Sequence, residues 1–248
     1  MQEKGVFLVT GGSRGIGAAT ALLAAKHGYP VAIFYRERED EAARVVNTIE
    51  NAGGRAMAVR ADVADEDALM RGFEAVDRFG SLQVLVNNAG VTGGMSRLED
   101  LSAAAIEQVC RVNIIGAFLA AREAVRRMST RRGGSGGSIV NVSSGAAVHG
   151  TPNTWIHYAA SKGALDTMTI GLSKEVALEG IRVNAVRPGV ISTDIHEHRS
   201  VTQMTELEKA IPLGRFGTPE EIAEAIVWLA SPAASYVIGA LLDARGGY

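Results

Sequence analysis

Tyr158 and Lys162 lie four positions apart in the run "HYAASKGA" at residues 157–164. On a helix, positions i and i+4 share one face, so the phenol and the ammonium group could meet there. A phenol can both give and take a proton, and a nearby ammonium group favours its ionised form and lowers its pKa. The pair therefore has the residue types for general acid and base chemistry at an oxygen atom. The spacing alone leaves a second interpretation open, in which both side chains are exposed and their apolar parts cover the helix surface.

The run "TGGSRGIG" at residues 10–17 sets Gly11, Gly15 and Gly17 between a strand-like and a helix-like segment. Glycine adopts backbone conformations that other residues avoid, and it lets a phosphate group approach the main chain. The start of the following helix directs N–H groups at such an anion. Because this turn opens a chain of alternating strands and helices, we favour a dinucleotide site over a plain tight turn.

Apolar runs rich in β-branched residues alternate with helix-period segments along the whole sequence. The predicted strands span residues 5–10, 31–35, 55–59, 82–87, 137–143, 181–188 and 236–243. The predicted helices span residues 15–28, 39–53, 65–80, 102–128, 157–180 and 218–231. This alternation predicts one α/β domain over residues 1–248, a doubly wound parallel sheet of the Rossmann type with about seven strands and helices on both faces.

Helix ends in this pattern carry recognisable signals. Gly28, Gly53, Gly80 and Gly180 each follow a helical segment, where a left-handed glycine commonly ends a helix. Thr218 is followed by Pro219 and two glutamates, which is typical of a helix start.

The composition argues against several kinds of protein. The 248 residues are 47% hydrophobic and 21% charged, and they carry a formal net charge of −2 without blocks of like charge. Nothing in this balance favours nucleic acid or an anionic membrane as a partner. The single cysteine, Cys110, has no intrachain partner for a disulfide, and we expect a buried helix thiol. We expect no leader and no segment long and apolar enough to span a bilayer, hence a cytoplasmic protein.

A series of motifs, in order and over almost the whole chain, resembles those of the short-chain dehydrogenase/reductase family in its single-domain form. They are "TGGSRGIG" at 10–17, "NNAG" at 87–90, Asn113 in "RVN", "NVSS" at 141–144, the Tyr158 and Lys162 pair, and "RPGVIST" at 187–193. The sequence departs from the family in the interval between Ser144 and Tyr158, which is one residue longer than usual, and in the C-terminal "DARGGY". We choose Ser144 over Ser143 as the active serine by its place in the "NVSS" strand motif.

The resemblance implies an oxidoreductase that transfers a hydride between a nicotinamide and a carbonyl or secondary alcohol. Tyr158 would be the general acid and base, and Lys162 would tune it and hold the nicotinamide ribose. Ser144 would donate a hydrogen bond to the substrate oxygen. Asn113 would anchor a water that leads from the lysine to solvent; alternatively, it bonds backbone within its helix, and both roles could coexist.

The resemblance also implies a set of cofactor contacts at the strand ends. Asp62 would face the adenine, although a lone aspartate at a strand end is more often a turn or helix cap. The implied cofactor-binding residues are Gly11, Ser13, Arg14, Gly15, Ile16, Gly17, Tyr35, Arg36, Asp62, Val63, Asn88, Ala89, Gly90, Tyr158, Lys162, Pro188, Gly189, Ile191 and Thr193.

The end of the second predicted strand favours NADP(H) as the cofactor. Enzymes that use NAD commonly carry an acidic residue there, which bonds the ribose 2′-hydroxyl. The family resemblance sets Tyr35 at this position, followed by Arg36, and Arg14 lies in the facing turn. A guanidinium group can hold a 2′-phosphate with two hydrogen bonds. NAD(H) stays open, because Glu37, one position beyond Arg36, could serve as the acid if the strand end were shifted.

The polar segment at residues 191–214 follows the sixth strand at its carboxyl end and is a candidate substrate lid. The run "HEH" at 196–198 lacks a third ligand at a known spacing, so we expect no metal site. His149 and His157 flank the loop between the serine and the tyrosine and could border the substrate.

The nature of the substrate stays open. Sugar or polyol dehydrogenases and 3-oxoacyl-carrier-protein reductases both resemble the sequence, and residues 191–214 offer no obvious basic platform for an acidic carrier protein. A silent dinucleotide-binding sensor or scaffold is the alternative from another class, which the complete set of Ser144, Tyr158 and Lys162 argues against. The apolar C-terminal segment resembles the part through which family members pair, so we expect a homotetramer.

Overall fold

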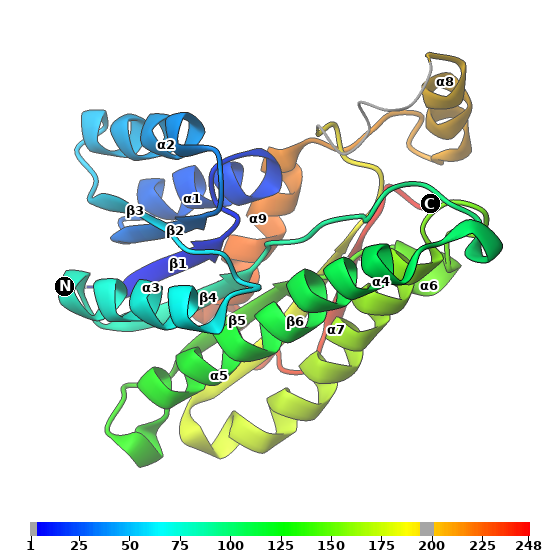
Figure 1. Cartoon of the computed structure of the whole chain (residues 1–248). Helices are drawn as coiled ribbons and strands as arrows, with labels where there is room; N and C mark the ends of the chain where they lie inside the picture. Colours follow the sequence, from blue (N-terminus) through cyan, green and yellow to red (C-terminus); the bar gives the residue numbers. More distant parts are fainter. Residues whose placement is uncertain (1–3, 194–200) are drawn as a thin grey trace.

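The computed structural model describes residues 4–193 and 201–248 (Figure 1). Within them, seven strands form one sheet with the order β3-β2-β1-β4-β5-β6-β7, and every neighbouring pair is parallel. The strands are β1 Val6–Thr10, β2 Val31–Tyr35, β3 Ala56–Arg60, β4 Leu82–Asn87, β5 Gly137–Val142, β6 Ile181–Pro188 and β7 Leu241–Ala244. The predicted Rossmann-type α/β fold is therefore confirmed.

Helices cover both faces of this sheet. Figure 1 shows α1, α2 and α9 on one face and α3, α5 and α7 on the other. The α-helices are α1 Gly15–Lys26, α2 Glu39–Asn51, α3 Glu66–Phe79, α4 Ala103–Val109, α5 Ala117–Met128, α6 Ala146–His149, α7 Ile156–Val176, α8 Val201–Ala210 and α9 Pro219–Ala230. A π-helical turn, η2 Cys110–Gly116, joins α4 to α5, and short 3-10 turns lie at Leu98–Asp100, Thr130–Arg132, Ala177–Glu179 and Pro232–Ala234.

Two hydrophobic cores follow from the alternation of side chains along each strand. In β1, Phe7 packs into the core under α1 and α9, whereas Leu8 packs into the core under α3 and α5, and neither side chain is exposed. Successive side chains of a strand point to opposite faces, so a strand covered on both faces must be apolar throughout. This explains why the strands read as continuous apolar runs in the sequence.

The order of the strands reverses between β1 and β4, the two strands that begin the two halves of the sheet. In open parallel sheets, ligands bind outside the carboxyl ends of the strands at such a reversal. The glycine turn after β1 and the "NNAG" motif at the end of β4 both lie there.

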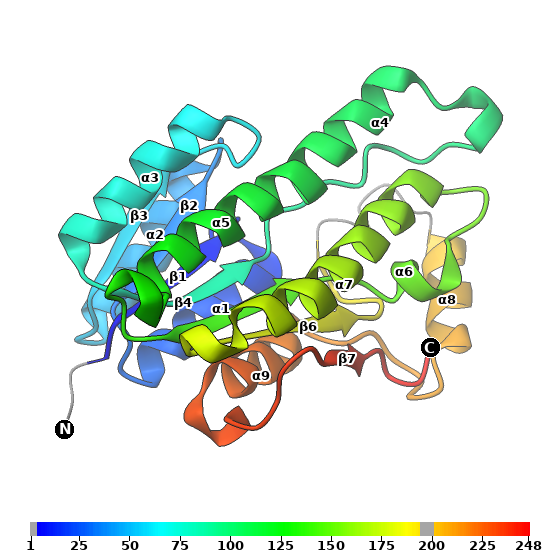
Figure 2. The same ribbon diagram turned by 90° about the horizontal axis from the view of Figure 1, so that it is seen from below.

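The helix predicted over residues 102–128 is continuous but not uniform. Its middle, Cys110–Gly116, widens into a π-helical turn, a feature that often marks functional sites. Figure 2 shows α4 and α5 running beside α7. Cys110 lies in this turn and is partly exposed rather than buried.

The segment Ala103–Met128 is long and apolar enough, by length and composition, to cross a membrane, which corrects our expectation from the sequence. It is nevertheless a core helix. α5 packs on β4, and its Glu123 is 2% exposed and accepts hydrogen bonds from Arg126 and Arg127, each at 2.8 Å. Such a bonded carboxylate belongs in a protein interior and would be costly in lipid.

Two other predictions about boundaries need correction. Gly28, Gly53 and Gly180 lie in the left-handed region as predicted, with φ angles of 79°, 82° and 75°, but Gly80 has φ 164° and ψ 173°, so α3 ends in extended backbone. The last strand begins at Leu241 rather than at Tyr236, whose side chain is fully exposed. The helix start at Thr218 is confirmed, because its side chain and that of Glu221 form a reciprocal capping box.

Candidate active site

A cleft of about 1010 Å³ runs along the carboxyl ends of the central strands. The loops that follow β1 to β6 line it, so it joins the glycine turn at one end to the region of Ser144 and Tyr158 at the other. Of the residues to which the family resemblance assigns cofactor contacts, all but Gly17 line this cleft.

The glycine turn is shaped by close backbone approaches. Gly11 and Gly15 have φ angles of 64° and 53°, in the left-handed region that favours glycine. A side chain on Gly17 would put its Cβ 2.3 Å from the carbonyl oxygen of Gly11. Gly17 therefore packs against the backbone of the turn and does not line the cleft. Asn88 fixes the opposite side by donating to the carbonyl oxygens of Thr10 and Gly11 at 3.0 and 2.9 Å.

Helix α1 begins at this turn with its N–H groups available to a ligand. Its N-cap residue, Arg14, makes no side-chain hydrogen bond that caps the helix, and the first turn has no acidic residue. The positive end of the helix dipole and these N–H groups favour a phosphate group at the turn. The cradle therefore fits the pyrophosphate of a dinucleotide.

Tyr158 and Ser144 meet at the other end of the cleft. Both side chains line it, and the Tyr158 hydroxyl is hydrogen-bonded to Ser144. Burial raises the pKa of Tyr158 above its usual value of 10.0, and the hydrogen bond to Ser144 opposes this only in part. Tyr158 is therefore protonated at neutral pH in this structure.

Lys162 lies one helical turn beyond Tyr158 on α7 and is almost fully buried. Its ammonium nitrogen donates to the carbonyl oxygen of Val142 at 2.7 Å and lies 5.6 Å from the centre of the Tyr158 ring. Burial lowers the pKa of Lys162 to about 8, against the charge of Asp166, which raises it. The sequence led us to expect that the lysine lowers the pKa of the tyrosine. In this structure desolvation dominates both groups, and the pKa of Tyr158 is raised instead.

The two serines at the end of the "NVSS" motif, Ser143 and Ser144, have different surroundings. The Ser143 hydroxyl is buried and donates to the backbone carbonyl of Lys162 at 3.2 Å. The Ser144 hydroxyl accepts from the backbone nitrogen of Ala146 at 3.1 Å and faces Tyr158. Both serines line the cleft, but Ser143 holds β5 to α7, whereas the Ser144 hydroxyl lies beside Tyr158.

Asn113 is fully buried in the π-helical turn and does not line the cleft. Its amide accepts from the backbone nitrogen of Val91 at 2.8 Å and donates to the carbonyl oxygen of Val91 at 2.9 Å. It also donates to Ser161, which in turn donates to the carbonyl oxygen of Tyr158. Asn113 thus ties the loop after β4 to the first turns of α7. The structure thus agrees with the alternative in which Asn113 bonds backbone groups, but these belong to Val91 in the loop after β4 and not to the helix of Asn113.

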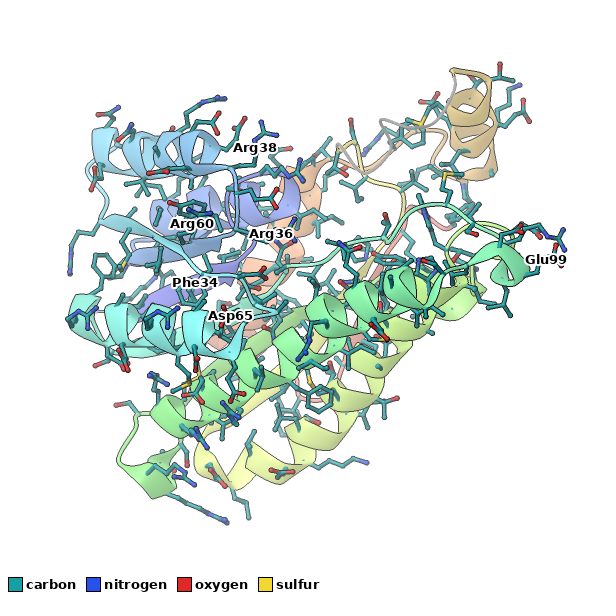
Figure 3. All side chains as sticks on the ribbon, in the orientation of Figure 1. Phe34, Arg36, Arg38, Arg60, Asp65 and Glu99 are labelled. Carbon is teal, nitrogen blue, oxygen red and sulfur yellow. The ribbon has the colours of Figure 1, made fainter. Side chains whose placement is uncertain are left out.

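The end of the cleft that lies farthest from Tyr158 and Ser144 is lined by polar residues. Asp62 lines the cleft and its carboxylate accepts from the backbone nitrogen of Ala64 at 2.9 Å, so the turn-cap interpretation holds for it. Arg36 pairs with Glu37 at 2.7 Å, and both side chains are exposed. Figure 3 shows Arg36 and Arg38 on the loop between β2 and α2. Arg38 also lines the cleft and was missed from the sequence, although it directly follows Glu37.

The substrate half holds residues that the sequence did not single out. Besides the expected His149, the residues lining it include Gln108, Thr151, Thr154, Trp155, Leu207 and Tyr248. His157 does not line the cleft, because its ring is buried against Gly93. Within the part of the chain that the structure describes, no three histidine, cysteine or acidic residues form a metal site. The "HEH" run at 196–198 and part of the candidate lid lie outside the described residues.

Comparisons with known proteins agree with this fold and site. The family model described as "Enoyl-(Acyl carrier protein) reductase" matches residues 11–248. The chain is 50% identical over 244 residues to the uncharacterized oxidoreductase YgfF of Escherichia coli strain K12, covering 98% of this chain and 99% of that protein. It is 41% identical over 244 residues to an L-rhamnose 1-dehydrogenase (NAD(P)(+)) of a Sphingomonas species, covering 97% and 94%.

A solved structure extends the likeness to three dimensions. A blue fluorescent protein from a metagenomic library, solved in complex with NADPH, superposes with a TM-score of 0.90 at 34% identity and covers 98% of this chain and 96% of that one. The chain therefore belongs to the short-chain dehydrogenase/reductase family. It is an oxidoreductase that acts on a CH–OH group with NAD(P).

Proposed function

We propose that this oxidoreductase uses NADP(H) to interconvert a carbonyl compound and a secondary alcohol, with Tyr158 as general acid and base. The observation that carries the proposal is the hydrogen-bonded pair of Tyr158 and Ser144 beside the ammonium of Lys162, in a cleft that also holds a phosphate cradle. When bound, the nicotinamide supplies or accepts the hydride.

In the direction of reduction, Tyr158 gives its proton to the oxygen of the substrate as negative charge develops there. The raised pKa keeps Tyr158 protonated near neutrality, which suits this direction. Ser144 donates a hydrogen bond to the same oxygen and orients it. In the reverse direction, Tyr158 must first lose its proton, so alcohol oxidation requires a higher pH.

Lys162 has two roles in this proposal. Its ammonium group carries three donors, of which one bonds the carbonyl oxygen of Val142, so others can hold the nicotinamide ribose hydroxyls. Below its pKa of about 8, its positive charge favours the ionised form of Tyr158, and this charge is lost as the pH rises further. The hydrogen bonds of Asn113 hold the first turns of α7 against the loop after β4. That Asn113 also anchors a water rests on the family resemblance alone.

The preference for NADP(H) rests on Tyr35 and Arg36. Tyr35 ends β2, where an NAD-dependent enzyme commonly has an acid, and Arg36 follows at the cleft edge. Glu37, the residue that would favour NAD(H), pairs with Arg36 in this structure. The NADPH complex of a structural relative supports this choice, although the rhamnose dehydrogenase relative is named for both cofactors.

The substrate proposal covers sugars and polyols, because one relative is a rhamnose dehydrogenase. It also covers 3-oxoacyl groups on a carrier protein, because a 3-oxoacyl-[acyl-carrier-protein] reductase of a Synechocystis species is 38% identical to this chain over 248 residues. A silent dinucleotide-binding sensor is the alternative function. A cytoplasmic location is also part of the proposal, and a single, partly exposed cysteine is in keeping with a reducing compartment.

We also propose a homotetramer, because two separate apolar faces are exposed. Ile115 and Phe118 lie on the η2 and α5 face, whereas Trp228, Tyr236 and Ile238 lie on and after α9. Two different self-complementary interfaces on one chain generate a closed tetramer. Light scattering at micromolar concentration should give the mass of four chains, and a monomer mass would refute this assembly.

A screen of carbonyl compounds with NADPH, followed by absorbance at 340 nm, tests the proposed reaction. We expect substrate-dependent loss of NADPH with at least one sugar-derived or 3-oxoacyl compound. Tight NADPH binding without turnover across the whole panel would favour the sensor instead.

A further inference from the structure

The last residues of the chain hold an arginine in a fixed position at the substrate half of the cleft. Arg245 follows β7 and packs between Gly145 and Gly189, where a Cβ on either glycine would lie 2.8 Å from an Arg245 atom. The backbone nitrogen of Gly189 donates to the carbonyl oxygen of Ala244 at 3.0 Å. Arg245 is thus fixed between the loop that carries Ser144 and the loop that follows β6.

The guanidinium of Arg245 in turn orients His149. One of its nitrogens lies 2.9 Å from Nε2 of His149, and another lies 3.0 Å from a carboxylate oxygen of Asp243. Because a guanidinium group has only donors, Nε2 of His149 must accept this bond, and the ring proton must sit on Nδ1. The edge contact with the Tyr248 ring, 5.3 Å between centroids, holds the imidazole from a second side.

The fixed tautomer leaves Nδ1 of His149, an exposed residue, as an N–H donor. His149 and Tyr248 line the cleft together with Ser144 and Tyr158. Across residues 4–193 and 201–248, no protein group accepts a hydrogen bond from Nδ1 of His149. A rigid N–H donor without a protein partner at a binding cleft suits an acceptor on a bound molecule.

We propose that His149, oriented by Arg245, donates a hydrogen bond from Nδ1 to an oxygen of the substrate remote from the reacting carbon. The inference rests on the proposed function and narrows its substrate class to small hydroxylated ketones and their alcohols, such as polyols and hydroxylated rings. Thr154 and Gln108 line the same half of the cleft, where the Gln108 amide is a further polar group for such a molecule, whereas the Thr154 hydroxyl already donates to the carbonyl oxygen of Thr151 at 3.1 Å. The hydrocarbon tail of an acyl substrate would offer no acceptor to the His149 donor.

A matched pair of ketones tests the inference. Cyclohexanone and 4-hydroxycyclohexanone share the ring and the reacting carbonyl and differ by one remote hydroxyl. We expect wild-type enzyme to prefer the hydroxylated ketone about three- to tenfold in kcat/KM, the range that one net hydrogen bond supports. His149→Phe keeps an aromatic ring beside Tyr248 but removes the donor, so the ratio should fall to about one.

Two further variants separate binding from a structural role. His149→Gln retains an N–H donor and should restore part of the preference for the hydroxylated ketone. Arg245→Met frees the imidazole and should reduce this preference, with only a small change in the thermal unfolding temperature. His27→Phe, at the exposed end of α1, is the matched control and should leave the ratio unchanged.

The outcomes distinguish this inference from the proposed function. Equal kcat/KM for the two ketones, or a preference that survives in folded His149→Phe, would overturn the inference and leave the reductase assignment intact. Turnover of other carbonyl compounds but of neither ketone would overturn it in the same way. No turnover of any carbonyl compound would refute the proposed function itself.

Discussion

The ammonium nitrogen of Lys162 lies 5.6 Å from the centre of the Tyr158 ring, and both side chains come from one face of α7. The i,i+4 spacing is therefore a real contact and not an exposed pair. Burial, however, governs the pKa of each group: that of Tyr158 is raised and that of Lys162 is lowered to about 8. Tyr158 is therefore protonated near neutrality, and Lys162 is the first of the two groups to lose its proton as the pH rises.

Replacing Lys162 should impair both cofactor binding and turnover. Lys162→Ala removes the proposed donor for the nicotinamide ribose and the positive charge beside Tyr158. We expect the Kd for NADPH, measured by fluorescence titration, to rise about tenfold or more, as for loss of a charged hydrogen bond. Lys174→Ala, near the end of the same helix, is the control. Unchanged NADPH affinity in Lys162→Ala would show that the lysine does not hold the ribose.

The low pKa of Lys162 also predicts a pH dependence of stability. Between about pH 8 and the usual lysine value of 10.5, the unfolded chain binds a proton at this residue that the folded chain does not. The contribution of Lys162 to the free energy of unfolding therefore rises with pH in this window. At about 1.36 kcal/mol per pH unit, the rise from pH 8 to 9.5 is about 2 kcal/mol.

Urea unfolding at pH 7.5, 8.5 and 9.5 checks this prediction. The free energy of unfolding of the wild type, minus that of Lys162→Met, should increase with pH. The range stops below pH 10, because the raised pKa of Tyr158 acts in the opposite direction there: ionisation of the unfolded tyrosine lowers stability as the pH rises. Parallel pH profiles for the two proteins would mean that the lysine is not desolvated in the folded state.

Arg36 should determine the choice of cofactor. Arg36→Ala removes the guanidinium beside Tyr35, so kcat/KM with NADPH should fall at least tenfold while the value with NADH changes little. The exposed Arg44→Ala on α2 controls for a general loss of positive charge. Wild-type enzyme that is more efficient with NADH, or an Arg36→Ala variant with unchanged NADPH efficiency, would contradict the assignment.

Local patterns were enough to predict the fold and much of the cleft. The glycine turn and the Tyr158 and Lys162 pair each lie within a few consecutive residues, so their spacing carries the geometry. Gly80 was predicted wrongly because a glycine after a helix need not adopt a left-handed conformation. Tyr236 was wrongly included in a strand because apolar character alone does not distinguish a strand from an exposed apolar surface.

Other features depend on contacts between distant segments. Asn113 bonds Val91 and Ser161 from a π-helical turn, which no periodicity in the sequence reveals. The pair of His149 and Arg245 joins residues 96 positions apart, and only the fold brings them together. The pKa of Tyr158 depends on how much protein surrounds it, which the identity of its neighbour Lys162 does not tell.

The most direct test of the proposed mechanism is the turnover of Tyr158→Phe compared with the wild type, measured as NADPH oxidation at 340 nm with the best carbonyl substrate of the screen. The substitution keeps the ring and its packing and deletes the proton that the substrate oxygen receives. We expect kcat to fall by about 10²-fold or more, in keeping with loss of a general acid, while the Kd for NADPH stays within about twofold. A folded Tyr158→Phe enzyme that retains wild-type kcat would contradict the assignment of Tyr158 as the general acid.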